Sequence, residues 1–334
     1  MIFATSLRSS RSSRFKTWSK EINVTGSTKL SVSQEESMNY LALLGLLSFA
    51  LACGGPTDES VPVADEPAPI VARPGNIAAS DGVAIAYTVS GAGSPTLVFI
   101  HGWMCDQSFW AEQVDDFART NTVITIDLPG HGLSGMDRDG WPMTAYGADV
   151  QAVVEKLDLN NVVLIGHSMG GAVVLEAARL MPDRVIGVIG VDSLHDAEAR
   201  YDPDQMKGYF AAYEADFIGT CLQMVTSMFQ EDADPALVER VTNDMCDGSP
   251  EISLALLREF IEYEMGPALA AVAEIPVQYI NAEMYPTNPE SNQKYHPTFS
   301  GVIVQGVGHF LMMEKPEEFN ELLRQTIEGL EQRK

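Results

Sequence analysis

Short, mostly apolar runs alternate with longer amphipathic stretches along residues 82–334. The apolar runs cover residues 96–100, 122–127, 162–165, 185–191, 276–280 and 301–305, and residues 83–90 alternate with period 2. Runs without a polar face predict strands that are buried on both sides. Helical periodicity between them predicts helices at about 108–118, 144–157, 168–180 and 316–331. The pattern indicates an α/β fold with a mostly parallel sheet flanked by helices.

Residues 196–270 interrupt this alternation. They contain no convincing strand, and their apolar residues recur at helical spacing. About 75 residues between two strands of one sheet are too many for an unstructured loop. We therefore expect an inserted helical lid, whose aromatic and methionine side chains form mostly its own core and in part an apolar pocket. These side chains are Tyr201, Phe210, Tyr213, Phe217, Met224, Met228 and Phe229.

The N-terminal residues differ in composition from the rest of the chain. Residues 1–53 hold six basic and three acidic side chains, whereas residues 54–334 hold 15 and 43. Met38–Cys53 contains about a dozen uncharged apolar residues, the length of a secretory h-region and short for a membrane span. This segment resembles a bacterial lipoprotein signal, although Ala50 stands where leucine is usual. The resemblance implies cleavage before Cys53, lipidation of that cysteine, and a lipid anchor on the periplasmic side of the cell envelope.

The domain organisation predicted from these patterns has five parts. They are a leader (1–53), a flexible Pro-, Gly- and acid-rich tether (54–76), a first part of the core (77–195), the lid (196–270) and a second part of the core (271–334). Three other interpretations of the leader stay open. They are a translation start at Met38, an uncleaved N-terminal segment, and an organellar transit peptide.

The overall charge narrows the possible partners. The net charge of the chain is −25, with 21 basic and 46 acidic side chains, which argues against binding to nucleic acid or to an anionic membrane surface. Contact with a membrane is then expected only through the lipid anchor. The sequence has no zinc-ligand spacing, Walker sequence or dinucleotide fingerprint, so we expect neither a cofactor nor a metal. We expect a small molecule as the substrate.

Two cysteines of the predicted lid are candidates for a disulfide. Cys221 and Cys246 are 25 residues apart. In an oxidising compartment such a pair would close a loop that is worth about 3 kcal/mol. Two buried thiols are the alternative.

The sequence "GHSMGG" (residues 166–171) carries the clearest chemistry. It follows the apolar run 162–165 and opens a predicted helix. Gly-X-Ser-X-Gly alone is a weak signal, but a tight strand-to-helix turn would present the hydroxyl of Ser168 at a helix N-terminus. The helix dipole there favours a developing negative charge.

Three further motifs accompany this one in a fixed order. They are "VFIHGW" (98–103), "DLPGHGLS" (127–134) and "GVGHFLMMEKPEEF" (306–319). With them, the chain resembles the α/β-hydrolase family over roughly residues 75–331. The resemblance implies that Ser168 is the nucleophile and His309 the general base. It also implies that the backbone amides of Trp103 and Met169 form an oxyanion hole.

The acidic member of such a triad departs from the usual pattern. Many family members carry an aspartate at the position where this chain has Tyr285. Asp192 is the favoured replacement, because it ends the run 185–191, and haloalkane dehalogenases place their acid after this earlier strand. Glu283, which lies close to the usual position but two residues early, is the alternative acid. Asp196, or no acid at all, is the remaining possibility.

A serine at position 168 excludes the dehalogenase and epoxide-hydrolase reactions, which need an aspartate there. The sequence therefore predicts a serine hydrolase that cleaves an ester, thioester, lactone or amide through an acyl-enzyme. The lid composition suggests a small, mostly apolar substrate. A non-hydrolytic ligand-binding or receptor-like homologue is the alternative, and Tyr285 is the feature that favours it.

Overall fold

The computed structural model describes residues 71–332, so the predicted leader with Cys53 and most of the predicted tether lie outside the described residues. An eight-stranded sheet has the order β1-β2-β4-β3-β5-β6-β7-β8. The strands are β1 (Arg73–Ala78), β2 (Ala84–Ser90), β3 (Thr96–Ile100), β4 (Thr122–Asp127), β5 (Val162–His167), β6 (Val185–Val191), β7 (Val277–Ala282) and β8 (Ser300–Val304). Strands β3 to β8 are parallel, and β1 and β2 are antiparallel additions at one edge. The predicted fold class is confirmed.

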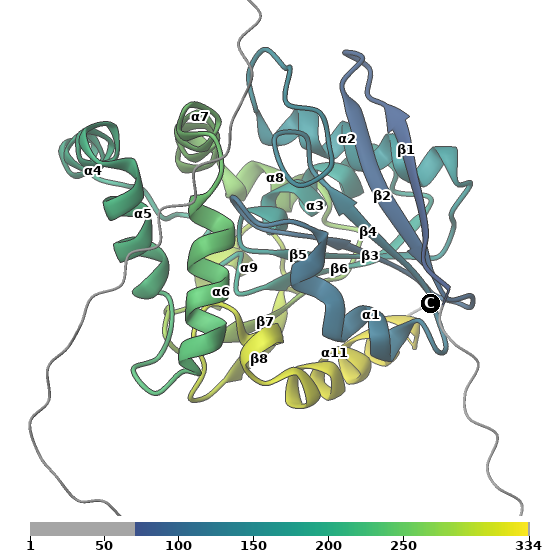
Figure 1. Cartoon of the computed structure of the whole chain (residues 1–334). Helices are drawn as coiled ribbons and strands as arrows, with labels where there is room; N and C mark the ends of the chain where they lie inside the picture. The colour runs from purple at the N-terminus through teal and green to yellow at the C-terminus, as the bar shows by residue number, and fades with distance from the viewer. Residues whose placement is uncertain (1–70, 333–334) are drawn as a thin grey trace, which may run out of the picture. The chain divides into compact units, whose positions relative to one another are not determined.

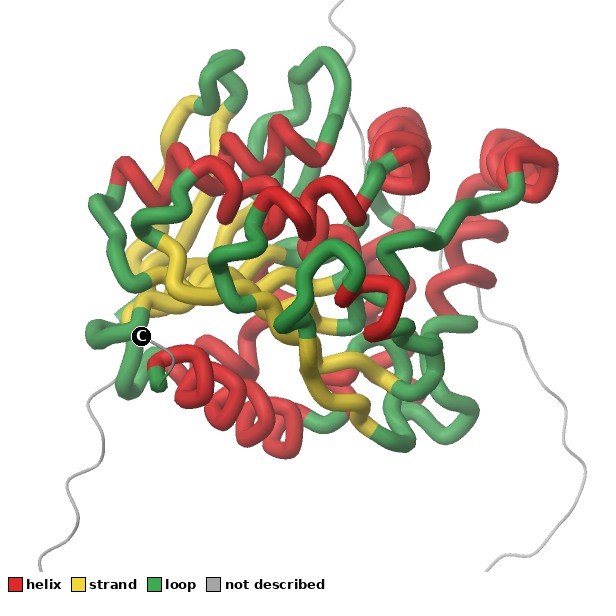
Figure 2. The backbone as a smooth tube through the Cα atoms, turned by 180° about the vertical axis from the view of Figure 1, so that it is seen from behind, coloured by secondary structure: helices red, strands yellow, loops and turns green. Residues whose placement is uncertain are grey.

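Helices cover both faces of this sheet. Helices α1 (Ala111–Phe117) and α11 (Pro316–Glu331) lie on one face, and α2 (Met143–Lys156), α3 (Met169–Leu180) and α8 (Met265–Ala271) lie on the other (Figure 1). Seen from behind, the strands run between these two helical layers (Figure 2). Three short helices complete the layers: a 3₁₀ turn at Gln107–Trp110, α9 (Pro289–Gln293) and α10 (Leu311–Glu314).

The inserted residues form a separate group of helices beside the sheet. They are α4 (Pro203–Ala215), α5 (Phe217–Thr226), α6 (Pro235–Cys246) and α7 (Pro250–Glu262) (Figure 1). Asp202, Asp234 and Ser249 precede α4, α6 and α7, and each accepts a hydrogen bond from a first-turn amide with proline next in the chain. This is a common helix start, and it explains why the segment is helical.

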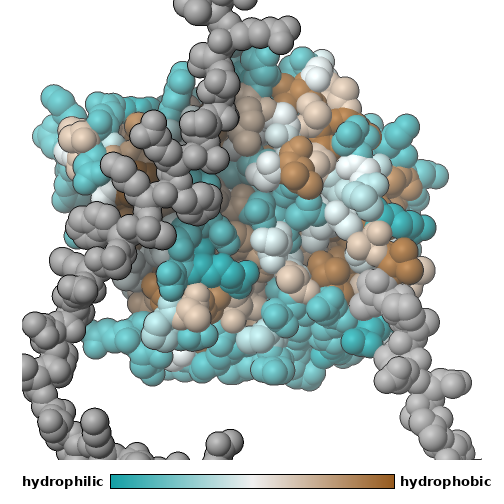
Figure 3. Space-filling model, viewed as in Figure 1, coloured by the Kyte–Doolittle hydropathy of each residue, from teal (hydrophilic) through white to brown (hydrophobic). Residues whose placement is uncertain are grey.

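The burial of the strands explains the apolar runs in the sequence. Every residue of β3 and β5 is buried, because helices cover both of their faces. Polar residues face outward instead, and the lower edge of the molecule in Figure 3, over α11, is largely hydrophilic. Among residues 71–332 no helix is both long and apolar enough to cross a bilayer.

One boundary of the predicted tether is wrong. Residues 73–76 belong to β1, which pairs with β2 through Arg73–Val89 to Ala78–Ala84. Pro74 and Gly75 made this segment look irregular, since both are rare in strand interiors. Proline is tolerated here because β1 is the edge strand and its free side needs no amide donor.

Candidate active site

Ser168 occupies the turn between β5 and α3. Its φ is +53°, in the left-handed region that non-glycine residues rarely adopt. Three hydrogen bonds hold this backbone: its N–H donates to the Val191 carbonyl at 3.0 Å, and its own carbonyl accepts from the Ser193 hydroxyl at 2.6 Å and from the Gly171 amide at 3.0 Å. The strained turn places Ser168 at the carboxyl end of β5 and at the start of α3, as the motif predicts.

Close backbone contacts explain the glycines around this turn. A Cβ atom added at Gly170 would lie 2.6 Å from the Ile100 carbonyl oxygen, so only glycine lets α3 approach the end of β3. A Cβ atom added at Gly102 would lie 3.1 Å from the Cβ of Ser168. The "HGW" segment therefore passes directly beside Ser168.

The two predicted oxyanion-hole residues belong to segments next to this serine. Met169 is the first residue of α3, where backbone amides have no partner within the helix. Trp103 follows Gly102 directly, and its indole N–H donates to the Ser253 carbonyl of α7 at 2.9 Å. Its ring also meets Tyr213 of α4 edge-on, with 6.3 Å between the ring centres. The side chain of Trp103 thus joins the core to the lid.

Asp192 follows β6 just as Ser168 follows β5. The two strands are parallel neighbours with His167 paired to Val191, so Ser168 and Asp192 come next to each other at the same edge of the sheet. The side chain of Asp192 is fully buried. One of its oxygens, Oδ2, lies 2.5 Å from His309 Nδ1, and the other, Oδ1, accepts the Ala282 amide at 2.8 Å.

The alternative acids lie elsewhere. Glu283 is exposed, and its Oε1 accepts the Gly306 amide at 2.9 Å. Asp196 binds the Ser291 hydroxyl and the Asn288 amide. Tyr285 packs edge-on against the His309 ring, with 5.8 Å between the ring centres. Of the three carboxylates weighed from the sequence, the structure brings only Asp192 to His309.

Four hydrogen bonds that the sequence did not predict hold the His309 loop. The His309 amide donates to the Met228 carbonyl of the lid at 2.8 Å, and the His167 Nε2–H donates to the His309 carbonyl at 2.9 Å. The carboxylate of Glu314 accepts the amides of Gly308 at 2.9 Å and Phe310 at 3.2 Å. Glu314 belongs to the motif that contains His309. A carboxylate five residues after the histidine is the sequence signal that could have predicted these contacts.

The remaining histidines have structural partners. His101 Nε2 accepts the Leu128 amide at 3.0 Å, and His296 Nε2 donates to the Ile275 carbonyl at 2.9 Å. Burial lowers the pKa of His101 to about 4 and that of His131 to about 3, and it lowers the pKa of His167 well below its ordinary value. These buried rings are therefore uncharged at neutral pH and serve packing and hydrogen bonding.

The aromatic side chains of the lid are mostly internal to it. Tyr213 is fully buried and Phe210 nearly so, whereas Tyr201 is 52% exposed. Tyr201 and Phe210 line a cavity of about 690 Å³ between α4 and the end of α7, and every residue lining this cavity comes from the lid. Phe229 reaches the core instead and stacks on Phe310, with 5.0 Å between the ring centres.

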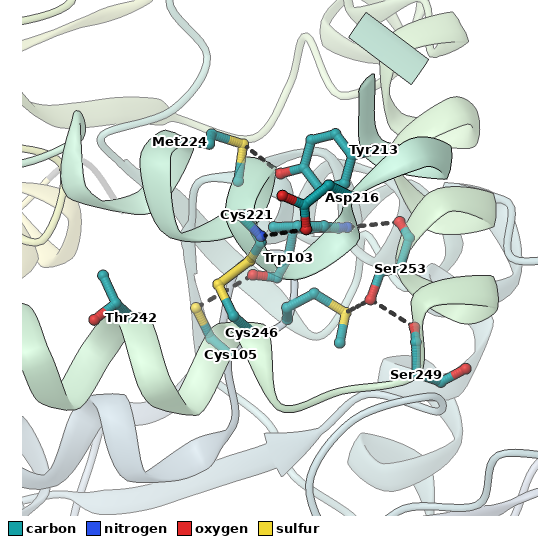
Figure 4. Close-up of a disulfide and its surroundings, with 12 residues drawn as sticks. Trp103, Cys105, Tyr213, Asp216, Cys221, Met224, Thr242, Cys246, Ser249 and Ser253 are labelled. Carbon is teal, nitrogen blue, oxygen red and sulfur yellow. Dashed lines mark hydrogen bonds between the residues drawn. A yellow bond between two sulfur atoms is a disulfide. The ribbon is translucent and has the colours of Figure 1, made fainter. Parts of the chain in front are cut away.

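A disulfide joins Cys221 of α5 to Cys246 at the end of α6 (Figure 4). The chain after α5 contains Met228, whose carbonyl accepts the His309 amide. The chain after α6 leads to α7, where Ser253 accepts the indole N–H of Trp103. The bridge thus joins the two lid segments that contact the His309 loop and the Trp103 loop.

Cys105 is a buried free thiol near this bridge, and burial raises the pKa of the thiol well above its ordinary value.

Removing the bridge is expected to destabilise the protein. The Cys221→Ala/Cys246→Ala double variant should unfold with a free energy about 3 kcal/mol lower than that of the parent chain, because the unfolded state regains the freedom of a 25-residue loop. Urea unfolding of both proteins measures the difference, with Cys105→Ala as the control for loss of a cysteine outside the bridge. Equal midpoints and slopes for the double variant and the parent chain would contradict this expectation.

Comparisons with known proteins bear on the family and the fold of this chain. Residues 97–322 match the model of the alpha/beta hydrolase family. The chain is 27% identical over 305 residues to a dihydrolipoyllysine-residue acetyltransferase component of an acetoin cleaving system from Cupriavidus necator, covering 86% of this chain and 79% of the relative. It is also 27% identical to a 3-oxoadipate enol-lactonase from Acinetobacter baylyi, covering 71% of this chain and 91% of the relative.

A solved structure has the same fold. Est816, described as an N-acyl homoserine lactone degrading enzyme, superposes with a TM-score of 0.66 at 25% identity, covering 75% of this chain and 99% of that one. The family model spans more than half of the chain and includes the Ser168 turn, Asp192 and His309. The chain therefore belongs to the alpha/beta hydrolase family.

Proposed function

We propose that this protein is a serine hydrolase that cleaves an ester, thioester, lactone or amide bond of a small, mostly apolar substrate through an acyl-enzyme. The observation that carries the proposal is the buried contact of 2.5 Å between His309 Nδ1 and Asp192 Oδ2. With its Nδ1–H donated to a carboxylate, a neutral imidazole has its lone pair on Nε2 and can take a proton there. A histidine so arranged is a suitable base for Ser168.

The mechanism follows from these roles. Ser168 Oγ attacks the carbonyl carbon while its proton passes to His309 Nε2, and Asp192 stabilises the imidazolium that forms. The tetrahedral oxyanion accepts hydrogen bonds from the amides of Met169 and Trp103. The intermediate collapses when His309 protonates the leaving group, and a water molecule, activated by the same histidine, then releases the acyl group.

The relatives support an ester-type bond. The enol-lactonase and the N-acyl homoserine lactone degrading enzyme are both described as acting on lactones, which are cyclic esters. Opening a lactone and cleaving an open-chain ester need the same nucleophile, base and oxyanion donors. The aromatic and methionine side chains in the sequence of the lid favour a mostly apolar substrate.

The non-hydrolytic, ligand-binding alternative loses its main support. It rested on Tyr285, which stands where a carboxylate is usual. Asp192 supplies a carboxylate to His309 from the neighbouring strand β6, so the tyrosine does not leave the histidine without an acidic partner.

A series of p-nitrophenyl esters with acyl chains from acetyl to decanoyl, assayed with the full chain, tests the proposal. We expect a rapid release of one p-nitrophenol per protein, followed by slower turnover, because p-nitrophenol is a good leaving group and the acyl-enzyme then forms faster than water removes the acyl group. A folded protein that is stabilised by these esters against heat but releases no p-nitrophenol would contradict it and would favour the non-hydrolytic alternative.

A further inference from the structure

Asp192 faces a second imidazole. His195 lies in the loop after β6, and its Nε2 is 3.8 Å from Asp192 Oδ1, the oxygen that does not contact His309. The carboxylate therefore stands between two histidine rings, one on each oxygen. The mechanism above uses only the first of them.

Neighbouring side chains fix the orientation of His195. The Asn281 side-chain amide lies 3.3 Å from His195 Nδ1 and also donates to the Thr287 hydroxyl at 2.9 Å. That hydroxyl lies 3.1 Å from the same Nδ1 and is free to donate to it. Both protons of the Asn281 amide are donated elsewhere, to Thr287 and to the Ser193 carbonyl, so the Thr287 hydroxyl is the donor to Nδ1. The neutral ring then carries its proton on Nε2, the nitrogen that faces Asp192.

The Asn281 amide is itself held firmly. It is fully buried, its oxygen accepts the Ser193 amide at 3.1 Å, and its nitrogen donates to the Ser193 carbonyl at 2.9 Å. Ser193 follows Asp192 directly in the chain. The network that aims His195 is therefore built into the same turn that carries the candidate acid.

Three titratable groups face His195: Asp192 after β6, His309 before α10, and Tyr285 after β7. The Tyr285 ring meets both histidines edge-on, with centre distances of 6.1 Å to His195 and 5.8 Å to His309. Burial lowers the pKa of His195, and the charge of Asp192 opposes this only in part. The ring is therefore neutral at neutral pH.

We propose that His195 is a positioning residue for the proposed reaction: its Nε2–H, aimed by Thr287 and Asn281, lies 3.8 Å from Asp192 Oδ1 and adds a favourable dipole beside the Ala282 amide that donates to this oxygen, so that Oδ2 stays turned toward His309. This inference rests on the proposed function and adds a residue to it.

Comparing His195→Phe with His195→Gln in the full chain tests this role. For His195→Phe we expect kcat for an ester to fall about tenfold with KM within about twofold. The acid limb of kcat/KM against pH should move to higher pH. Without His195 beside it, the Asp192 carboxylate stabilises the protonated form of the base more strongly. His195→Gln keeps an N–H donor and is expected to recover most of kcat.

The outcomes separate this inference from the proposed function. A wild-type protein that does not hydrolyse any ester contradicts the proposed function and the inference with it. An active wild-type protein whose His195→Phe variant keeps both kcat and the pH profile contradicts the inference alone, as do equal losses in the Phe and Gln variants.

Thr287→Val gives a second test if His195→Phe does not fold, because it frees His195 Nδ1 without removing the ring. It should shift the acid limb in the same direction by a smaller amount, and an unshifted limb would contradict the inference.

Discussion

Replacing Ser168 by alanine is expected to lower kcat for ester hydrolysis by a factor of about 10⁴ or more, with the protein still folded. The hydroxyl is the atom that forms the acyl-enzyme, and its neighbours cannot substitute for it. Alanine has no oxygen and is smaller than serine, so the turn held by Val191 and Ser193 should persist. Steady-state kinetics with the best ester of the series measures the loss.

A matched serine variant keeps this test specific. Ser227 follows α5, and its hydroxyl donates only to the Met224 carbonyl at 2.6 Å, within the lid. Ser227→Ala should therefore keep kcat within about twofold, while thermal unfolding confirms that both variants are folded. A Ser168→Ala variant with more than a few per cent of the parent activity would contradict the role of Ser168.

Replacing Asp192 by asparagine is expected to lower kcat about 10⁴-fold. In chymotrypsin-like enzymes the same exchange costs this much, because asparagine supports the wrong tautomer of the histidine. Here the amide of Ala282 donates to Oδ1, so the asparagine oxygen would occupy that position. Its NH₂ group would then face His309 Nδ1 and move the ring proton to Nε2, where the base must be unprotonated.

Glu283→Gln is the matched control for that exchange. Its carboxylate is exposed and accepts only the Gly306 amide, so glutamine should keep kcat within about twofold. The same kinetic assay covers both variants. A large loss in Glu283→Gln together with full activity in Asp192→Asn would transfer the role of the acid to Glu283.

The sheet was largely predictable because burial on both faces leaves a plain trace in the sequence. The strands β3, β4 and β6 match the predicted residues 96–100, 122–127 and 185–191. Their apolar character follows from helices packed on either side. The edge strand β1 could not be recognised in this way, because it is mostly exposed and holds Pro74 and Gly75.

The candidate site was predictable where a short motif or a position directly after a predicted strand fixes the geometry. Ser168 is placed by its strand-to-helix turn, and Asp192 by the pairing of β5 with β6. The contacts that orient these groups join loops far apart in the chain, such as His195 with Thr287, 92 residues later, and they have no local signature. The same holds for Trp103, whose indole meets Ser253 of the lid 150 residues away.

The central claim is that Ser168 is an activated nucleophile, and reaction with a fluorophosphonate tests it most directly. Such a probe forms a stable bond with a serine only where a neighbouring base activates the hydroxyl. Peptide mass spectrometry of the treated full chain should find one phosphonate per protein, attached to Ser168, and much slower labelling in Asp192→Asn. A folded wild-type protein that stays unlabelled, or that carries the label on another serine, would contradict the account.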